Sequence, residues 1–83
     1  MEQIARTAKQ VGAIIRRHRR NKGLTQNDVS DKTRMRQATV SRLETGEYDT
    51  PLRTILDVLS ALDLEITIRD RSKSSKHDIE DMF

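Results

Sequence analysis

Residues 25–44 read TQNDVSDKTRMRQATVSRLE, and they divide into two short helical segments around a tight turn. Thr25 and Asp28 form a capping-box pattern, which predicts a helix over about 26–33. The next three residues leave room only for a turn, and a second helix is expected over about 37–44. Two short helices joined by a three-residue turn are typical of proteins that insert a helix into the DNA major groove.

The segments on either side of this motif complete a small, mainly α domain. Apolar residues at helical spacing predict one helix over about 7–21 and a longer amphipathic helix over about 51–62. Residues 64–69 alternate with a period of two instead, which predicts a β-strand. The expected organisation is an N-terminal arm, a DNA-binding domain, a strand and a flexible tail, over residues 1–6, 7–63, 64–69 and 70–83.

The expected strand has no partner elsewhere in the chain. Its apolar face consists of Leu64, Ile66 and Ile68. Unpaired backbone groups at a strand edge are a liability, and the same strand from a second copy, antiparallel across a two-fold axis, would satisfy them. The sequence therefore predicts a homodimer formed through this strand.

Positive charge gathers at the front of the chain. The net charge is +3, but residues 1–24 contain seven basic side chains and one acidic one. Such a concentration favours a polyanion partner, although a solvated helix face produces similar runs. The chain has no cysteine and no apolar run near the roughly 20 residues of a membrane span, so we expect a cytoplasmic protein.

The segment over about 37–43 has the short polar side chains that base reading requires. A glutamine that pairs bidentately with adenine is the most specific contact available, and we assign it to Gln37. Around it, hydroxyl groups, small apolar groups and arginines suit base edges and thymine methyls. The candidate base contacts are Arg36, Gln37, Ala38, Thr39, Ser41 and Arg42.

Gln26 lies in the first turn of the preceding helix, where backbone N–H groups and the helix dipole favour an anion. We expect Gln26, together with Thr25, to contact a DNA phosphate. A plain capping role is the alternative.

The sequence resembles the Cro and phage-repressor type of helix-turn-helix, also called the xenobiotic-response-element family. The resemblance covers about residues 7–63. It implies a lambda-repressor-like domain of four to five helices that binds operator DNA as a dimer. The residues that carry it are Ile15-Arg16, Arg19, Gly23-Leu24-Thr25-Gln26, Gln37-Ala38-Thr39-Val40-Ser41-Arg42-Leu43-Glu44-Thr45-Gly46, Pro51, Leu59 and Ala61-Leu62.

The same resemblance implies a structural ion pair between Arg19 and Glu44. Without it, Arg19 would be counted among the charges that face DNA. The remaining arginines of the first helix, Arg16, Arg17 and Arg20, then become the candidates for phosphate contact.

Within the family, the chain is most similar to HipB-type antitoxins, which have a strand and a flexible tail after the helical domain. The features that match are a basic residue before Gln37-Ala38-Thr39, the segment over 62–68 and the residues after 70. This resemblance implies a HipA-type kinase toxin as partner, neutralised by complex formation.

Several positions depart from the family pattern. Glu47 and Asp49 make the loop after residue 44 acidic, so we expect that loop to contribute little to phosphate binding. Arg34 stands where a glycine usually adopts a left-handed backbone, so we expect strain there. Arg36 stands where serine often caps the recognition helix. The arginine loses the capping hydroxyl group but provides a positive charge that can contact DNA.

An enzyme is not expected. The chain contains only two histidines, His18 and His77, and no phosphate-binding loop or nucleophile motif is present. We expect no cofactor, metal or small-molecule substrate. Two alternatives to the antitoxin interpretation remain: a free-standing phage-like or restriction-control repressor, and an interaction module that binds only protein.

Overall fold

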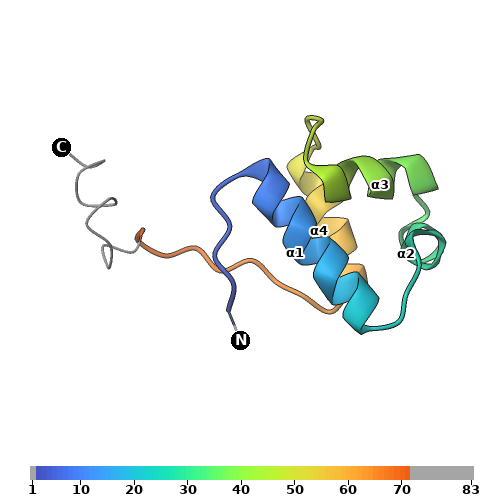
Figure 1. The fold of residues 1–83 in the computed structure, drawn as a ribbon, viewed down its shortest axis with the longest axis horizontal. Helices are drawn as coiled ribbons and strands as arrows, with labels where there is room; N and C mark the ends of the chain where they lie inside the picture. Colours follow the sequence, from blue (N-terminus) through green and yellow to red (C-terminus); the bar gives the residue numbers. More distant parts are fainter. Residues whose placement is uncertain (1, 72–83) are drawn as a thin grey trace.

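The computed structural model describes residues 2–71 and contains four α-helices in this part of the chain (Figure 1). Every bound lies within one residue of its prediction, and the mainly helical fold is confirmed. The helices are α1 (Ala8–Asn21), α2 (Gln26–Thr33), α3 (Gln37–Thr45) and α4 (Leu52–Ala61).

Local sequence determines where the first two helices begin. The Thr7 hydroxyl accepts a hydrogen bond from the Gln10 backbone N–H at 3.0 Å at the start of α1. At the start of α2, Thr25 and Asp28 exchange two hydrogen bonds and complete the predicted capping box. Each cap satisfies backbone N–H groups that a helix terminus leaves without an intrahelical acceptor.

The turn between α2 and α3 depends on Arg34. Its φ of 58° and ψ of 30° lie in the left-handed region, as its position in the motif predicted. A residue with a Cβ adopts this conformation at a cost of about 1–2 kcal/mol. The next residue, Met35, donates its backbone N–H to the Ser30 carbonyl oxygen at 3.1 Å, which closes the end of α2.

One aliphatic core holds the four helices together. α1 packs against α3, and α2 packs against both α3 and α4. Figure 1 shows α1 in front of α4, with α3 along one side and α2 at one end. The buried apolar residues are Ile15, Val29, Val40, Leu43, Val58, Leu59 and Leu62.

Two glycines permit the close approach of α1 to α3. A Cβ at Gly12 would overlap the backbone carbonyl oxygens of Leu43 and Glu44. Gly46 ends α3 with a φ of 67°, and a Cβ there would overlap the backbone of Lys9. The N-terminal half of α1 therefore approaches the C-terminal end of α3 too closely for a side chain at either position.

The predicted strand over 64–69 is not shown in the single chain, since residues 2–71 contain no strand. A ladder needs a second strand, and no segment of this part of the chain supplies one. Residues 64–71 leave α4 after a left-handed turn at Asp63 and cross the N-terminal arm (Figure 1). An ion pair at 3.3 Å between Glu2 and Arg69 links the arm to this segment.

Most of the expected tail lies outside the described residues, which end at residue 71. Within residues 2–71, no helix has both the length and the apolar content needed to cross a membrane.

Candidate nucleic-acid interface

The outer side of α3 contains the residues expected to read bases. Gln37, Ala38 and Arg42 are exposed, whereas Thr39 and Ser41 are half-buried at the border of the helix packing. The opposite side turns Val40 and Leu43 into the core. The structure thus brings the expected base contacts together on one helix, with Thr39 and Ser41 less accessible than the other residues.

A chain of hydrogen bonds connects this outer side to the protein interior. The Gln37 side-chain amide donates to the Gln26 side-chain oxygen at 2.8 Å, and Gln26 donates in turn to Glu44 Oε1 at 3.1 Å. Residues from the starts of α2 and α3 are thereby connected to the end of α3. Sequence reasoning named both glutamines but not the bond between them.

Arg19 anchors this chain. Its Nε donates to Glu44 Oε2 at 2.6 Å, and a second guanidinium nitrogen donates to Glu44 Oε1 at 3.0 Å. The third nitrogen donates to the Leu24 carbonyl oxygen at 2.7 Å. Arg19 and Glu44 are only 8% and 6% exposed, and the hydrogen bonds to Glu44 raise the pKa of Arg19 above its ordinary value. This contact is the pair that the family resemblance implied.

The start of α2 offers less to a phosphate than its sequence suggested. The Thr25 backbone N–H donates to Asp28 Oδ2 at 2.8 Å, and its hydroxyl accepts from the Asp28 N–H at 3.0 Å. The hydrogen bond from the Thr25 backbone N–H is the main reason that the pKa of Asp28 is lowered, so this carboxylate stays ionised. A negative charge next to Thr25 opposes an incoming phosphate, while the Thr25 hydroxyl proton and the second Gln26 amide proton have no acceptor in these contacts.

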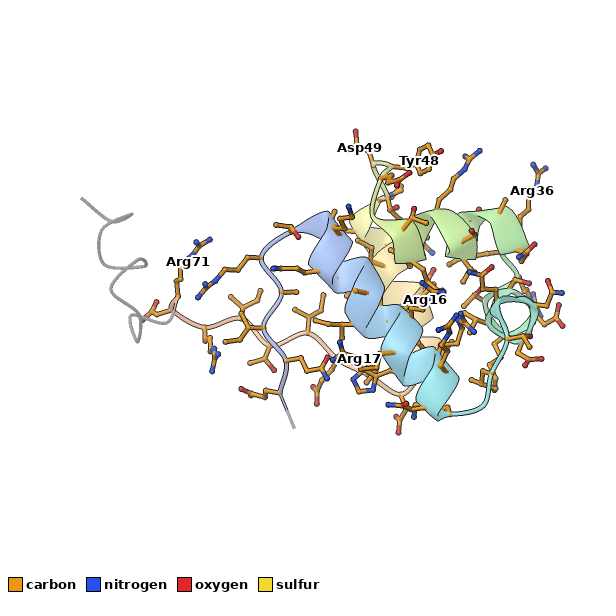
Figure 2. The ribbon with its side chains drawn as sticks, in the orientation of Figure 1. Arg16, Arg17, Arg36, Tyr48, Asp49 and Arg71 are labelled. Carbon is orange, nitrogen blue, oxygen red and sulfur yellow. The ribbon has the colours of Figure 1, made fainter. Side chains whose placement is uncertain are left out.

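The three candidate arginines of α1 share one exposed face. Arg16, Arg17 and Arg20 line a hollow together with Thr45 and Glu47, beside the C-terminal end of α3. In Figure 2, Arg17 lies on the lower side of α1, whereas Arg36 projects from the upper side of α3. The structure therefore gathers these arginines with one another beside the C-terminal end of α3, whereas Gln37 is the first residue of that helix.

The side chains of Arg36 and Arg42 differ in their contacts with the rest of the protein. Arg36 precedes α3 as its N-cap but makes no side-chain capping hydrogen bond, so its charge is exposed. The Arg42 guanidinium lies over the Tyr48 ring, 5.2 Å from the ring centroid. Tyr48 was absent from the predicted site, because it lies beyond the helix in a loop whose course the sequence does not specify.

The three residues expected at the dimer contact, Leu64, Ile66 and Ile68, differ in how far they are exposed to solvent. Leu64 packs partly against the core, whereas Ile66 and Ile68 are 47% and 93% exposed. Ile66 and Ile68 line an apolar hollow with Ile4 and Ile14. In the part of the chain that the structure describes, no group of three or more histidine or acidic side chains is placed to hold a metal ion.

Comparisons with known proteins agree with this geometry. The helix-turn-helix family matches residues 15–68. Antitoxin HipB of Escherichia coli strain K12 is 32% identical over 62 residues, which cover 75% of this chain and 70% of that protein.

Solved structures of helix-turn-helix proteins are also similar to this chain. A HipA-HipB-O2-O3 complex contains a chain with a TM-score of 0.79 at 28% identity, covering 86% of this chain and 100% of that one. The restriction-modification controller protein C.AhdI from Aeromonas hydrophila has a TM-score of 0.65 at 29% identity, covering 70% of this chain and 88% of that one.

Proposed function

This chain belongs to the helix-turn-helix family, and on that premise we propose that it is a sequence-specific, operator-binding repressor that acts as an antitoxin of the HipB type. The observation that carries the proposal is the hydrogen-bonded chain from Arg19 through Glu44 and Gln26 to Gln37. It holds an exposed amide at the start of α3, where helix-turn-helix proteins contact base edges.

Gln37 is the proposed base reader. Its amide gives one proton to Gln26 and retains a second proton and its carbonyl oxygen. Those two atoms are the pair that adenine N7 and N6 require, and such a contact discriminates by about 1–3 kcal/mol. Arg36 and Ala38, both exposed beside it, are the next base contacts in the proposal, with the half-buried Thr39 and Ser41 at the border of the site.

Phosphate contacts complete the proposed DNA interface. The Gln26 amide and the Thr25 hydroxyl are the donors at the start of α2, and they compete there with the Asp28 charge. On α1, we propose that the exposed face with Arg16, Arg17 and Arg20 increases affinity for DNA of any sequence. Contacts of this kind position a protein on DNA but carry no sequence information.

We also propose that two copies associate through residues 64–69. The support is the exposure of Ile66 and Ile68, which leaves apolar surface beside the N-terminal arm without cover in the single chain. Pairing of this segment with its copy would form the ladder that one chain lacks, and it would present two recognition helices to a two-fold operator.

The proposed protein partner is a HipA-type kinase toxin, by similarity to HipB. Neutralisation would follow from complex formation. A free-standing repressor is the second candidate, because the similarity to a restriction-modification controller protein extends over 70% of this chain.

DNA titration at several salt concentrations tests the DNA-binding function. We expect affinity that falls steeply as salt rises, since each phosphate contact contributes about 0.9 to the slope of log K against log salt. No measurable binding at low salt would contradict the proposal and favour a module that binds only protein. Co-purification of a kinase-like toxin encoded by the neighbouring gene would separate the antitoxin from the free-standing repressor.

A further inference from the structure

The Arg42 side chain is held by the loop that follows its own helix. Arg42 lies one helical turn after Ala38, on the outer side of α3, and its guanidinium lies over the Tyr48 ring at 5.2 Å. Tyr48 is 54% exposed, so the pair stands at the protein surface. Within residues 2–71, Arg42 forms no ion pair with the acidic residues Glu47 and Asp49 on either side of Tyr48.

The position of Tyr48 is itself constrained. Gly46, two residues earlier, adopts a φ of 67° and approaches the backbone of Lys9 too closely to accept any side chain. The Gly46 N–H and the Thr45 hydroxyl both donate to the Arg42 carbonyl oxygen, at 3.1 Å and 2.9 Å. The loop therefore leaves α3 in a direction determined by its packing on α1.

The outer side of α3 extends from Arg36 to Tyr48. Figure 2 shows Arg36 projecting near the start of the helix and Tyr48 near its other end, both on the upper side of the view. In helix-turn-helix proteins the N-terminal residues of the recognition helix contact base edges, and in the homeodomain variant the C-terminal end of that helix contacts the DNA backbone. By this geometry, Gln37 lies at the base-reading end and Arg42 toward the backbone end.

We propose that Tyr48 is a positioning residue that holds Arg42 for contact with a DNA phosphate at the C-terminal end of the recognition helix. This inference rests on the proposed DNA-binding function and changes the assigned role of Arg42, from base reading to phosphate contact. An arginine loses side-chain entropy on binding, and a guanidinium already stacked on a ring loses less. The positive charge also offsets the repulsion between a phosphate and the acidic residues that flank Tyr48.

Binding of the full chain to its selected operator and to unrelated duplex DNA tests the inference, with Tyr48→Leu, Tyr48→Phe and Arg42→Gln as variants. Tyr48→Leu is expected to weaken both affinities equally, by about two- to fivefold, whereas Tyr48→Phe retains the ring and the affinity. Arg42→Gln is expected to lower the salt slope by about 0.9 per phosphate contact and to leave the preferred sequence unchanged. Adding Tyr48→Leu to Arg42→Gln should then cause no further loss.

Three results overturn the inference while leaving the proposed function intact: wild-type affinity in Tyr48→Leu, independent effects of the two substitutions, or a changed base preference in Arg42→Gln with an unchanged salt slope. Failure of the wild-type chain to bind any DNA contradicts the proposed function instead. Thermal unfolding of each variant verifies that it folds.

Discussion

Gln37 donates a side-chain hydrogen bond to Gln26 across the turn of the motif, at 2.8 Å. Gln26 in turn donates a hydrogen bond to the buried Glu44, at 3.1 Å. The side chain proposed to read a base is therefore oriented by the same carboxylate that pairs with Arg19. Stability and recognition share one polar network, and residues in such a network do not act additively.

Gln26→Leu is expected to reduce sequence discrimination even though Gln26 contacts no base in the proposal. The substitution removes the acceptor that orients Gln37, and one hydrogen bond of this kind contributes about 0.5–1.5 kcal/mol. The affinity ratio between the operator and a single-base variant should fall accordingly. Asn27→Ala, at the exposed next position, is the control and should leave this ratio unchanged. An unchanged ratio in Gln26→Leu would show that Gln37 is oriented without it.

Arg19→Ala is expected to destabilise the fold by about 3–5 kcal/mol, because it leaves the buried Glu44 carboxylate without its partner. Thermal or denaturant unfolding measures this loss. Arg20→Ala removes a neighbouring arginine that is exposed, and its effect should stay within about 0.5 kcal/mol. Equal stability of the two variants would contradict the structural role of Arg19.

Arg34→Gly is expected to stabilise the protein by up to about 1 kcal/mol. Glycine removes the strain of a φ of 58°, and its greater freedom in the unfolded chain offsets part of that gain. Lys32→Gly, inside α2, is the control and should destabilise by about 1 kcal/mol. Changes of opposite sign in the free energy of unfolding, measured with denaturant, support strain at Arg34. A loss of stability in both variants would contradict it.

How much of this could be predicted from the sequence depends on the range of each interaction. The capping box of Thr25 and Asp28 spans three residues, so the pattern itself indicated it. The Arg19 and Glu44 pair joins residues 25 apart, and charge patterning alone would have assigned Arg19 to the DNA-facing surface.

The features that sequence reasoning missed depend on loop direction and on partners. The contact between Tyr48 and Arg42 follows from the turn at Gly46, which brings a loop residue back over the helix. The alternation over 64–69 predicted an apolar face, and two residues of that face, Ile66 and Ile68, are 47% and 93% exposed in the single chain. A period of two specifies only which side chains share a face. A strand also needs backbone hydrogen bonds to a second strand, which the single chain does not supply in residues 2–71.

Ile68→Asp is expected to weaken self-association by about ten- to a hundredfold, because burial of an isoleucine side chain contributes about 1.5–3 kcal/mol and a charge replaces it. Sedimentation across a dilution series measures the change. Thr67→Asp, on the other face of the same segment, is the matched control. Identical association of both variants, or a monomeric wild type, would contradict dimerisation through residues 64–69.

Base reading by Gln37 is tested by selection of bound sequences from a random DNA library, with the wild type and Gln37→Ala in parallel. We expect the wild type to select a defined half-site with an adenine that Gln37→Ala no longer requires, at a cost of about 1–3 kcal/mol for that base pair. The salt slope should stay the same, because Gln37 has no charge. An identical selected sequence in both proteins would contradict base reading by Gln37.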